Sequence, residues 1–364
     1  MKTFDVYSKP DKWLTPLLLG LVLLLLASCS LGGNPGDTQA TPTPGEARVN
    51  GFGTAANHVH AILALPNHLL VLATHYGLFR SRDGGTTWQE VAGGPNQLMQ
   101  GLMTYALAYS SLNPKRMYVL TQPNVVPHAG TLGLYTSADQ GQTWQLAIPT
   151  ASITSSSIYT VAAGNDTPDE VYIYLRDLGA LGLRVSLDAG KHFSGAGTLP
   201  FGSINGVLTL PQAPGQLLVY GSQGMARSVD GGTHWQVIKG ISGGIFDMAT
   251  AGPHSPIYAS GDAGVYFSRD GGKTFTLVSQ TYYASLTVSP SHPTIIYGET
   301  GVKTYRSSDG GHSWTTLPNI DGHLNAMAAD PSNADQVYLS LSYPTAVYQL
   351  QQNEAKWQSL TPQA

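Results

Sequence analysis

Short runs that alternate apolar and polar residues recur along most of this 364-residue chain, with glycine, proline and asparagine between them. Residues 283–290 alternate in this way, and residues 294–298 are rich in β-branched and aromatic side chains. Side chains of a β-strand point alternately to its two faces, so these runs predict strands. The repeating part of the chain shows no long stretch with helical periodicity. A unit of four such runs can be laid down seven times between residues 58 and 360.

An eight-residue motif, Ser-x-Asp-x-Gly-x-x-Trp/Phe, returns six times, each time between the third and fourth runs of a unit. Its copies begin at Ser81, Ser137, Ser186, Ser228, Ser268 and Ser307. A degenerate seventh copy ends at Trp357, and successive copies lie 39 to 56 residues apart. A period near ~40 residues is typical of one four-stranded propeller blade. We name the strands of a blade A, B, C and D and expect the motif at each C–D turn.

The motif resembles the Asp-box, or bacterial neuraminidase repeat, of sialidases, sortilin-like receptors and the photosystem II assembly-factor propeller. The resemblance covers nearly all of residues 58–360 and implies an all-β fold, a seven-bladed β-propeller of four-stranded antiparallel blades with Asp-boxes at the C–D turns. It also implies that the acid bonds backbone amides of its own loop and that the glycine takes a positive φ. We therefore interpret the boxed acids as structural: Asp83, Asp139, Asp188, Asp230, Asp270 and Asp309.

The segment before the first blade has the pattern of an export signal. Three lysines precede an apolar run at residues 17–27, which is short for a transmembrane span. The run leads into Leu-Ala-Ser-Cys ending at Cys29, which looks like a bacterial lipobox. We expect a lipoprotein signal peptide at residues 1–28 and lipidation of Cys29, followed by a flexible Gly/Pro/Thr linker.

This interpretation divides the chain into a signal peptide (1–28), the lipidated cysteine with its linker (29–52) and the propeller (53–364). The protein would then be extracytoplasmic and lipid-anchored through Cys29 to a bacterial membrane, on the cell surface or the periplasmic side. Cys29 is the only cysteine, so no internal disulfide can form.

The charges of the chain exclude one class of partner. The formal net charge is −4, and the basic residues are scattered among the repeats. Such a pattern gives no basic stripe for nucleic acid, so we expect none to bind. We expect the propeller to be a monomer.

Strand A is innermost in a propeller, so the D–A and B–C loops share one face, where we expect a binding site. Aligning the units on the proline that often ends strand A shows which residues are equivalent around the axis. Six positions before it lie His60, Asn205, Asp247, Ala284 and Asn325, and the units placed through Pro114 and Pro168 add Tyr105 and Tyr159. His58 and His323 lie two residues earlier and point the same way. These residues predict a mostly polar channel mouth formed by His58, His60, Tyr105, Tyr159, Asn205, Asp247, His323 and Asn325.

Ring closure would place the last unit beside the first, and with it His323 beside His58 and His60. Neutral imidazole suits copper, zinc and nickel, so these histidines form a candidate transition-metal site with Asp247 nearby or His75 as a fourth ligand. The alternative is that they bond water and neighbouring loops in a polar channel. His-x-His is a weak motif by itself.

Catalytic chemistry of the sialidase type is not expected. The sialidase Phe-Arg-Ile-Pro motif is absent, and most arginines lie in or beside the boxes, away from the axis. A different glycoside hydrolase stays open as an alternative, with Asp247 paired with Asp262 or Glu299 on the D–A/B–C face.

The same face carries tyrosines, which provide rigid contact area with a polar tip. Our main expectation is therefore a membrane-tethered, non-catalytic binding or scaffold module for a protein or glycan partner. The alternatives are the glycoside hydrolase and a transition-metal-binding propeller.

Overall fold

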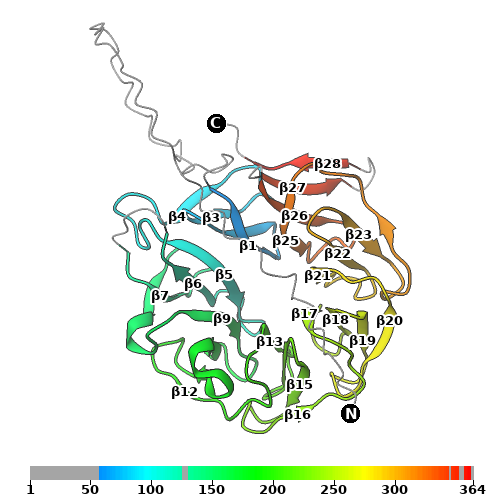
Figure 1. Ribbon diagram of the computed structural model, residues 1–364. Helices are drawn as coiled ribbons and strands as arrows, with labels where there is room; N and C mark the ends of the chain where they lie inside the picture. The colour runs from blue at the N-terminus through cyan, green and yellow to red at the C-terminus, as the bar shows by residue number, and fades with distance from the viewer. Residues whose placement is uncertain (1–56, 125–129, 344–345, 352–355, 362–364) are drawn as a thin grey trace, which may run out of the picture. The chain divides into compact units, whose positions relative to one another are not determined.

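The computed structural model describes residues 57–124, 130–343, 346–351 and 356–361. Within this part the chain forms seven four-stranded antiparallel sheets, arranged around a common centre (Figure 1). Every sheet is built from four consecutive strands, and the first strand of each lies nearest the centre. The expected seven-bladed all-β propeller is therefore confirmed.

The strands of the first four blades run outward in chain order. Their bounds are β1 (Val59–Leu65), β2 (Leu69–Thr74), β3 (Gly77–Ser81) and β4 (Gln89–Ala92); β5 (Met103–Tyr109), β6 (Met117–Gln122), β7 (Gly133–Ser137) and β8 (Gln145–Pro149); β9 (Ile158–Ala163), β10 (Val171–Leu175), β11 (Leu183–Ser186) and β12 (Ser194–Gly195); β13 (Gly206–Thr209), β14 (Leu217–Gly221), β15 (Gly224–Ser228) and β16 (Gln236–Val237).

Blades 5 to 7 follow the same plan. Their bounds are β17 (Ile245–Thr250), β18 (Ile257–Gly261), β19 (Gly264–Ser268) and β20 (Thr276–Ser279); β21 (Ser285–Val288), β22 (Ile296–Glu299), β23 (Thr304–Ser307) and β24 (Thr315–Thr316); β25 (His323–Ala329), β26 (Val337–Tyr343), β27 (Ala346–Gln351) and β28 (Lys356–Ser359). Two short 3₁₀ helices, η1 (Thr150–Ser152) and η2 (Arg176–Leu181), were not expected from the sequence. In the described part, no helix has the length and hydrophobicity needed to cross a membrane.

The second strand of each blade carries most of the core. All six residues of β2 and all five of β10 are buried, because a neighbouring blade covers each face of the sheet. Such strands read as continuous apolar runs, since both faces need apolar side chains. One cluster joins Leu120 of blade 2 with Val171 and Ile173 of blade 3. Contacts between blades, rather than within them, therefore form the hydrophobic core.

The ring closes between blade 7 and blade 1 by packing and hydrogen bonds. The Trp88 indole Nε1 donates to the Leu360 carbonyl over 2.9 Å, and both side chains lie in a cluster with Phe79 and Tyr338. Blade 7 has its own fourth strand, β28, as the sequence predicted. The predicted signal peptide, Cys29 and the linker lie outside the described residues.

The six boxes share one hydrogen-bond pattern at the C–D turns. In the second box, Asp139 accepts the Thr143 amide at 2.9 Å and the Thr143 hydroxyl at 2.6 Å. The Ser137 hydroxyl donates to the same carboxylate and accepts the Gly141 amide at 2.9 Å. Gly141 has a φ of +75°, which a residue with a Cβ adopts only with strain. The boxed carboxylates are thus engaged within their own turns, on the side of the blades away from the D–A/B–C loops.

Candidate functional site

The ring of equivalent channel residues holds the blades together. Four of its members hydrogen-bond the backbone of strand A in the next blade. The pairs are Tyr105 hydroxyl to Ile158 carbonyl, Asn205 Nδ2 to Ile245 carbonyl at 3.0 Å, Leu286 amide to Asp247 Oδ2 at 2.7 Å, and Asn325 Nδ2 to Val59 carbonyl. The structure thus brings these positions into one ring, as the alignment predicted, and uses part of their hydrogen-bonding capacity between blades. The Asn325 bond also shows that blade 7 adjoins blade 1.

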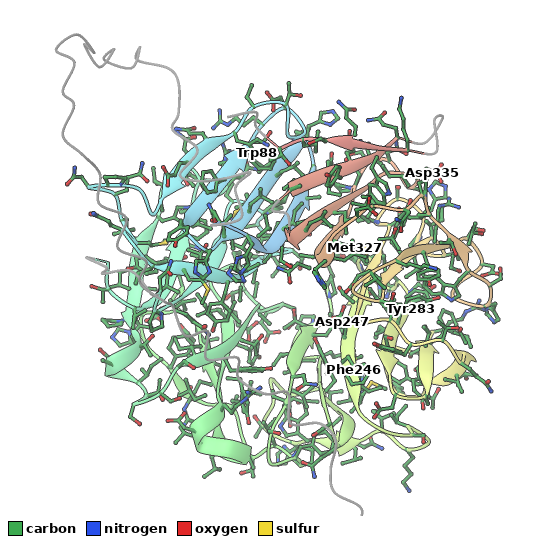
Figure 2. The ribbon with its side chains drawn as sticks, turned by 45° about the horizontal axis from the view of Figure 1, so that its top comes forward. Trp88, Phe246, Asp247, Tyr283, Met327 and Asp335 are labelled. Carbon is green, nitrogen blue, oxygen red and sulfur yellow. The ribbon has the colours of Figure 1, made fainter. Side chains whose placement is uncertain are left out.

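Asp247 is the carboxyl of this ring, and it keeps part of its surface exposed. It lies near the centre of the ring (Figure 2). Besides the Leu286 amide it accepts the Met248 amide at 2.9 Å and hydrogen bonds from the side chains of Ser285 and Tyr220. Burial among protein atoms nevertheless raises the pKa of Asp247 to about 6, against these donors. A carboxyl with this pKa can hold or release a proton near neutral pH.

Glu299 is a second carboxyl coupled to Asp247 across the boundary between blades 5 and 6. It ends β22, is only 3% exposed, and lies opposite Ser285 in the sheet register. Burial raises the pKa of Glu299 to about 7; a hydrogen bond from the Gly301 amide opposes this, and the charge of Asp247 adds to it. Both carboxyls therefore keep their protons to higher pH than ordinary carboxyls do.

The raised pKa of Glu299 predicts a pH-dependent change in stability for Glu299→Gln. A carboxyl whose folded pKa lies above its ordinary value loses stability as pH rises from about 4.5 to about 7. Glutamine carries no charge, so the variant should gain about 1–3 kcal/mol over the wild type at pH 8 and nothing comparable at pH 4.5. Urea denaturation at the two pH values measures this, and an equal difference at both would contradict it.

Asp262 is exposed and lies in the turn between β18 and β19 of blade 5. Its Oδ2 accepts the Gly244 amide at 2.7 Å, which fixes the loop that enters β17. Of the three predicted acids, the structure couples Asp247 with Glu299. It leaves Asp262 exposed on the same D–A/B–C face.

Two exposed aromatic rings lie beside this acidic region. Phe246 is 40% exposed and Tyr282 is 47% exposed, and their ring centroids are 5.7 Å apart in an edge-to-face arrangement. Phe246 directly precedes Asp247 at a β-bulge between Ile245 and Asp247. The sequence analysis expected tyrosines on this face and missed Phe246, because strict alternation does not show where a bulge occurs. Exposed rings of this kind offer a flat apolar surface beside polar groups.

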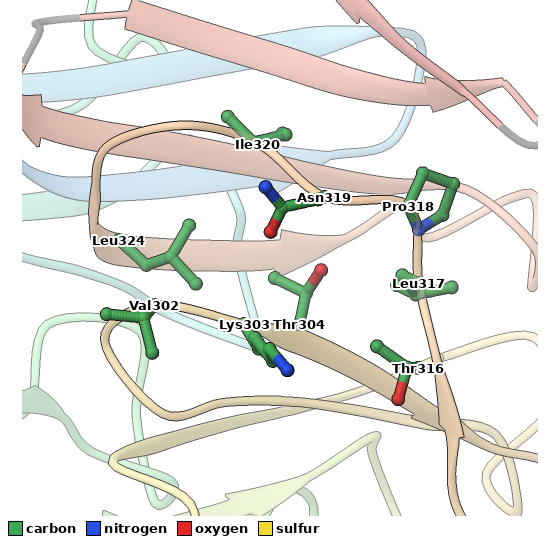
Figure 3. Close-up of a pocket in the computed structure, with 9 residues that line it drawn as sticks. All are labelled: Val302, Lys303, Thr304, Thr316, Leu317, Pro318, Asn319, Ile320 and Leu324. Carbon is green, nitrogen blue, oxygen red and sulfur yellow. The ribbon is translucent and has the colours of Figure 1, made fainter.

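A cavity of about 260 Å³ lies near the same face, between the outer part of blade 6 and β25 (Figure 3). Its lining includes Val302, Pro318, Ile320 and Leu324. The Leu324 amide donates to the Gly301 carbonyl at 3.0 Å, so the cavity shares a loop with Glu299. Its volume is just below the range of pockets for drug-sized ligands.

Three histidines meet on the opposite side of the channel mouth, in blade 1. The ligand nitrogens of His58, His60 and His75 all lie within 4.8 Å of one another. His323, which the sequence analysis placed in this group, begins β25 and does not belong to it. His75, the predicted fourth ligand, takes its place.

Tyr159, the remaining predicted member of the channel mouth, has its ring under a guanidinium. The Arg176 carbon Cζ lies 3.4 Å from the Tyr159 ring centroid. Arg176 begins η2 in the B–C loop of blade 3. This stacking holds an insertion that the sequence did not show as helical.

The Asp-box assignment also has support from comparison with known proteins. The family model described as BNR/Asp-box repeat matches residues 135–146, which cover the end of β7, the second box and the start of β8. The chain is an Asp-box β-propeller.

Relatives and solved structures extend the comparison of this Asp-box propeller. It is 30% identical over 233 residues to the xyloglucanase of Hypocrea jecorina (strain QM6a), a match that covers 58% of this chain and 26% of the relative. The structure of the GH74 xyloglucanase from Xanthomonas campestris superposes with a TM-score of 0.63 at 18% identity, covering 82% of this chain and 52% of that one. YCF48 from Cyanidioschyzon merolae gives a TM-score of 0.55 at 15% identity, covering 78% and 92%. The structural likenesses show the fold, and the chain spans about a quarter of the length of the curated relative.

These findings correct the functional expectation. Our main expectation of a non-catalytic binding or scaffold module is contradicted by the 30% identical relative, which is an enzyme that degrades a polysaccharide. Three solved GH74 structures share the fold of this chain. The findings favour the alternative, a glycoside hydrolase.

Proposed function

We propose that this Asp-box propeller is a glycoside hydrolase acting on xyloglucan or a related polysaccharide. The observation that carries the proposal is the carboxyl Asp247, partly exposed at the channel mouth with a pKa raised to about 6. Glycoside hydrolysis needs one carboxyl that delivers a proton and one that is ionised. The name of the 30% identical relative supports the substrate class.

In this proposal Asp247 donates its proton to the glycosidic oxygen as the bond to the anomeric carbon breaks. Asp247 regains its proton from water when hydrolysis is complete, and Glu299, buried nearby and coupled to Asp247 by charge, acts as a positioning residue. Asp262, exposed on the same blade, is the second carboxyl group, which activates water or attacks the anomeric carbon. The separation of two such carboxyls decides between these routes.

The location follows from the same proposal. Xyloglucan is a polysaccharide found outside the cytoplasm, in agreement with the predicted export signal and the lipobox predicted at Cys29. We propose that the enzyme works extracytoplasmically, with the lipid holding it at a membrane. Palmitate labelling of the full chain, lost in Cys29→Ala, would test the anchor.

The direct test is hydrolysis by the purified full-length chain. Xyloglucan, mixed-linkage β-glucan and cellulose are each incubated with the protein, and new reducing ends are counted. Asp177→Asn is a matched control, because Asp177 lies on the same face in blade 3 and bonds Thr154 rather than the acidic region. We expect turnover on xyloglucan by both proteins. Binding without new reducing ends on every substrate would overturn the proposal.

The exposed ring pair predicts an effect on substrate binding. One face of a pyranose ring carries mainly C–H groups, and it would pack on Phe246 and Tyr282. Phe246→Ala with Tyr282→Ala should raise KM about tenfold, because about 1–2 kcal/mol of aromatic contact is lost, with kcat largely retained. Tyr109→Ala, which removes an exposed ring at the far end of β5, is the control. Equal kinetic effects of the two changes would contradict a binding role.

A further inference from the structure

The backbone of blade 1 places three imidazoles in one corner of the channel mouth. His58 directly precedes β1 and His60 is its second residue, and their ring centroids lie 4.5 Å apart. The register of β1 against β2 shifts between Val59 and Ala61, which makes His60 the extra residue of a β-bulge. Bulges redirect a side chain and are frequent beside functional sites.

The third imidazole arrives from the B–C loop. The His75 amide donates to the His58 carbonyl at 2.9 Å, which continues the β1–β2 ladder by one bond. The His75 carbonyl accepts the Asn124 side-chain amide at 2.8 Å, from the neighbouring blade. The Tyr76 amide is bound to the Asn57 side chain at 3.1 Å. The backbone that carries His75 is thus held from three directions.

The rings themselves are closely packed. Their centroids are 4.5 Å apart for His58 and His60, 4.7 Å for His58 and His75, and 5.8 Å for His60 and His75. Two nitrogens on one zinc ion stand roughly 3.4 Å apart in a tetrahedral site. The ligand nitrogens of the three histidines lie within 4.8 Å of one another, so small side-chain rotations would bring them to that spacing.

Two of the nitrogens lack a hydrogen-bond partner among the described residues. Nε2 of His60 and Nδ1 of His75 are buried, and no described residue hydrogen-bonds either of them. This sets His60 apart from Tyr105, Asn205 and Asn325, which occupy equivalent ring positions and bond the next blade. A buried polar atom without a partner costs free energy, and a bound ligand removes that cost.

The charge state of the group also suits a metal ion. Burial, and then the neighbouring His58 and His75, lowers the pKa of His60 to about 4. Burial and His75 also lower the pKa of His58. Neutral imidazole is the form that coordinates metals.

We propose that His58, His60 and His75 bind one late first-row transition-metal ion, Cu²⁺ or Zn²⁺, with the remaining coordination positions open to the channel. An all-imidazole set favours these ions over Ca²⁺ and Mg²⁺, which prefer oxygen ligands. Copper should bind more tightly than zinc, because affinity for nitrogen ligands rises to copper and falls again at zinc. The site does not depend on the proposed hydrolase activity, since it lies in blade 1 and the carboxyls lie in blades 5 and 6.

The experiment measures bound metal in the full-length chain, purified without a histidine tag. The protein is exposed to Cu²⁺ or Zn²⁺, dialysed, and analysed by ICP-MS beside His60→Ala and His75→Ala. The control is the double variant His192→Ala/His234→Ala, in which the exposed box histidines paired with Asp188 and Asp230 are removed. We expect about one metal ion per chain in the wild type and the control, and at least a tenfold weaker affinity in each single variant.

A second measurement separates metal binding from folding. Ligand binding to the folded state raises Tm, so Zn²⁺ should raise the Tm of the wild type and the control but not that of His60→Ala. His60→Gln, which keeps a polar side chain, should fold and still fail to bind. No metal in the wild type would overturn the proposal, and so would equal binding by the wild type and the folded His60→Gln variant.

Discussion

Asp247→Asn is expected to lower kcat on xyloglucan by about 10²–10⁴-fold, the usual contribution of a general acid. The wild-type activity should fall as pH rises above about 6, because deprotonation of Asp247 removes the proton donor. The variant should lose this pH dependence along with its activity. Reducing-end assays between pH 4.5 and 8 measure both effects.

The same substitution also touches the join between blades 5 and 6. Asp247 accepts the backbone amides of Leu286 and Met248, and an asparagine replaces one acceptor oxygen with a donor. Stability must therefore be measured with activity, and we expect a loss of about 1–3 kcal/mol with the fold retained. Glu299→Gln, which we expect to keep more activity than Asp247→Asn, serves as comparison. An Asp247→Asn protein that is folded and fully active would remove Asp247 from the mechanism.

Trp88→Ala should destabilise the propeller by about 3–5 kcal/mol, the usual cost of truncating a buried tryptophan. Trp88 packs with Leu360 and Phe79 and lies where blade 1 meets blade 7 (Figure 2). The variant loses the packing and the indole bond to the Leu360 carbonyl together. Chemical denaturation gives the free energy, and hydrogen exchange should show β28 opening before the other strands.

The matched control is Trp314→Ala. Trp314 occupies the same box position in blade 6, but its indole bonds the Gly311 carbonyl of its own turn and the residue is less buried. We expect its replacement to cost clearly less than that of Trp88. An equal loss of unfolding free energy in the two variants would show that Trp88 does not stabilise the join between blades 7 and 1 more than Trp314 stabilises its own blade.

The fold was predictable because the same strand and turn pattern recurs in every unit of the sequence. The run predicted at residues 294–298 overlaps β22, and the predicted turn geometry of the box appears at Gly141 with its positive φ. A propeller places equivalent residues at equivalent radii, so counting from one proline located the ring of Tyr105 and Asn325. Each blade repeats the same local interactions, so a strand that is hard to recognise in one unit can be located by alignment with the other units.

The site was less predictable because it depends on departures from the repeat. Phe246 is the extra residue of one bulge and presents an exposed ring, and His60 is the extra residue of another, in the group that contains His75 instead of His323. A bulge adds one residue without a clear sequence mark. The coupling of Asp247 to Glu299 needs the distance between two blades, which no spacing within one blade supplies.

The main functional expectation failed for a different reason. Missing sialidase arginines exclude one chemistry on this fold, and they say nothing about hydrolases that bind neutral sugars. A fold hosts many reactions, and the residues of the site decide among them.

All four described strands of blade 7 come from consecutive sequence, and among the described strands none is exchanged across the join with blade 1. The join is made by packing around Trp88 and Leu360 and by the Asn325 bond, which resembles the bonds that Tyr105 and Asn205 make between consecutive blades. The closed ring therefore does not itself mark which blade comes first in the sequence. Whole blades are the units that duplication can add or remove, and the acidic region and the histidine group, borne on different blades, can be inherited separately.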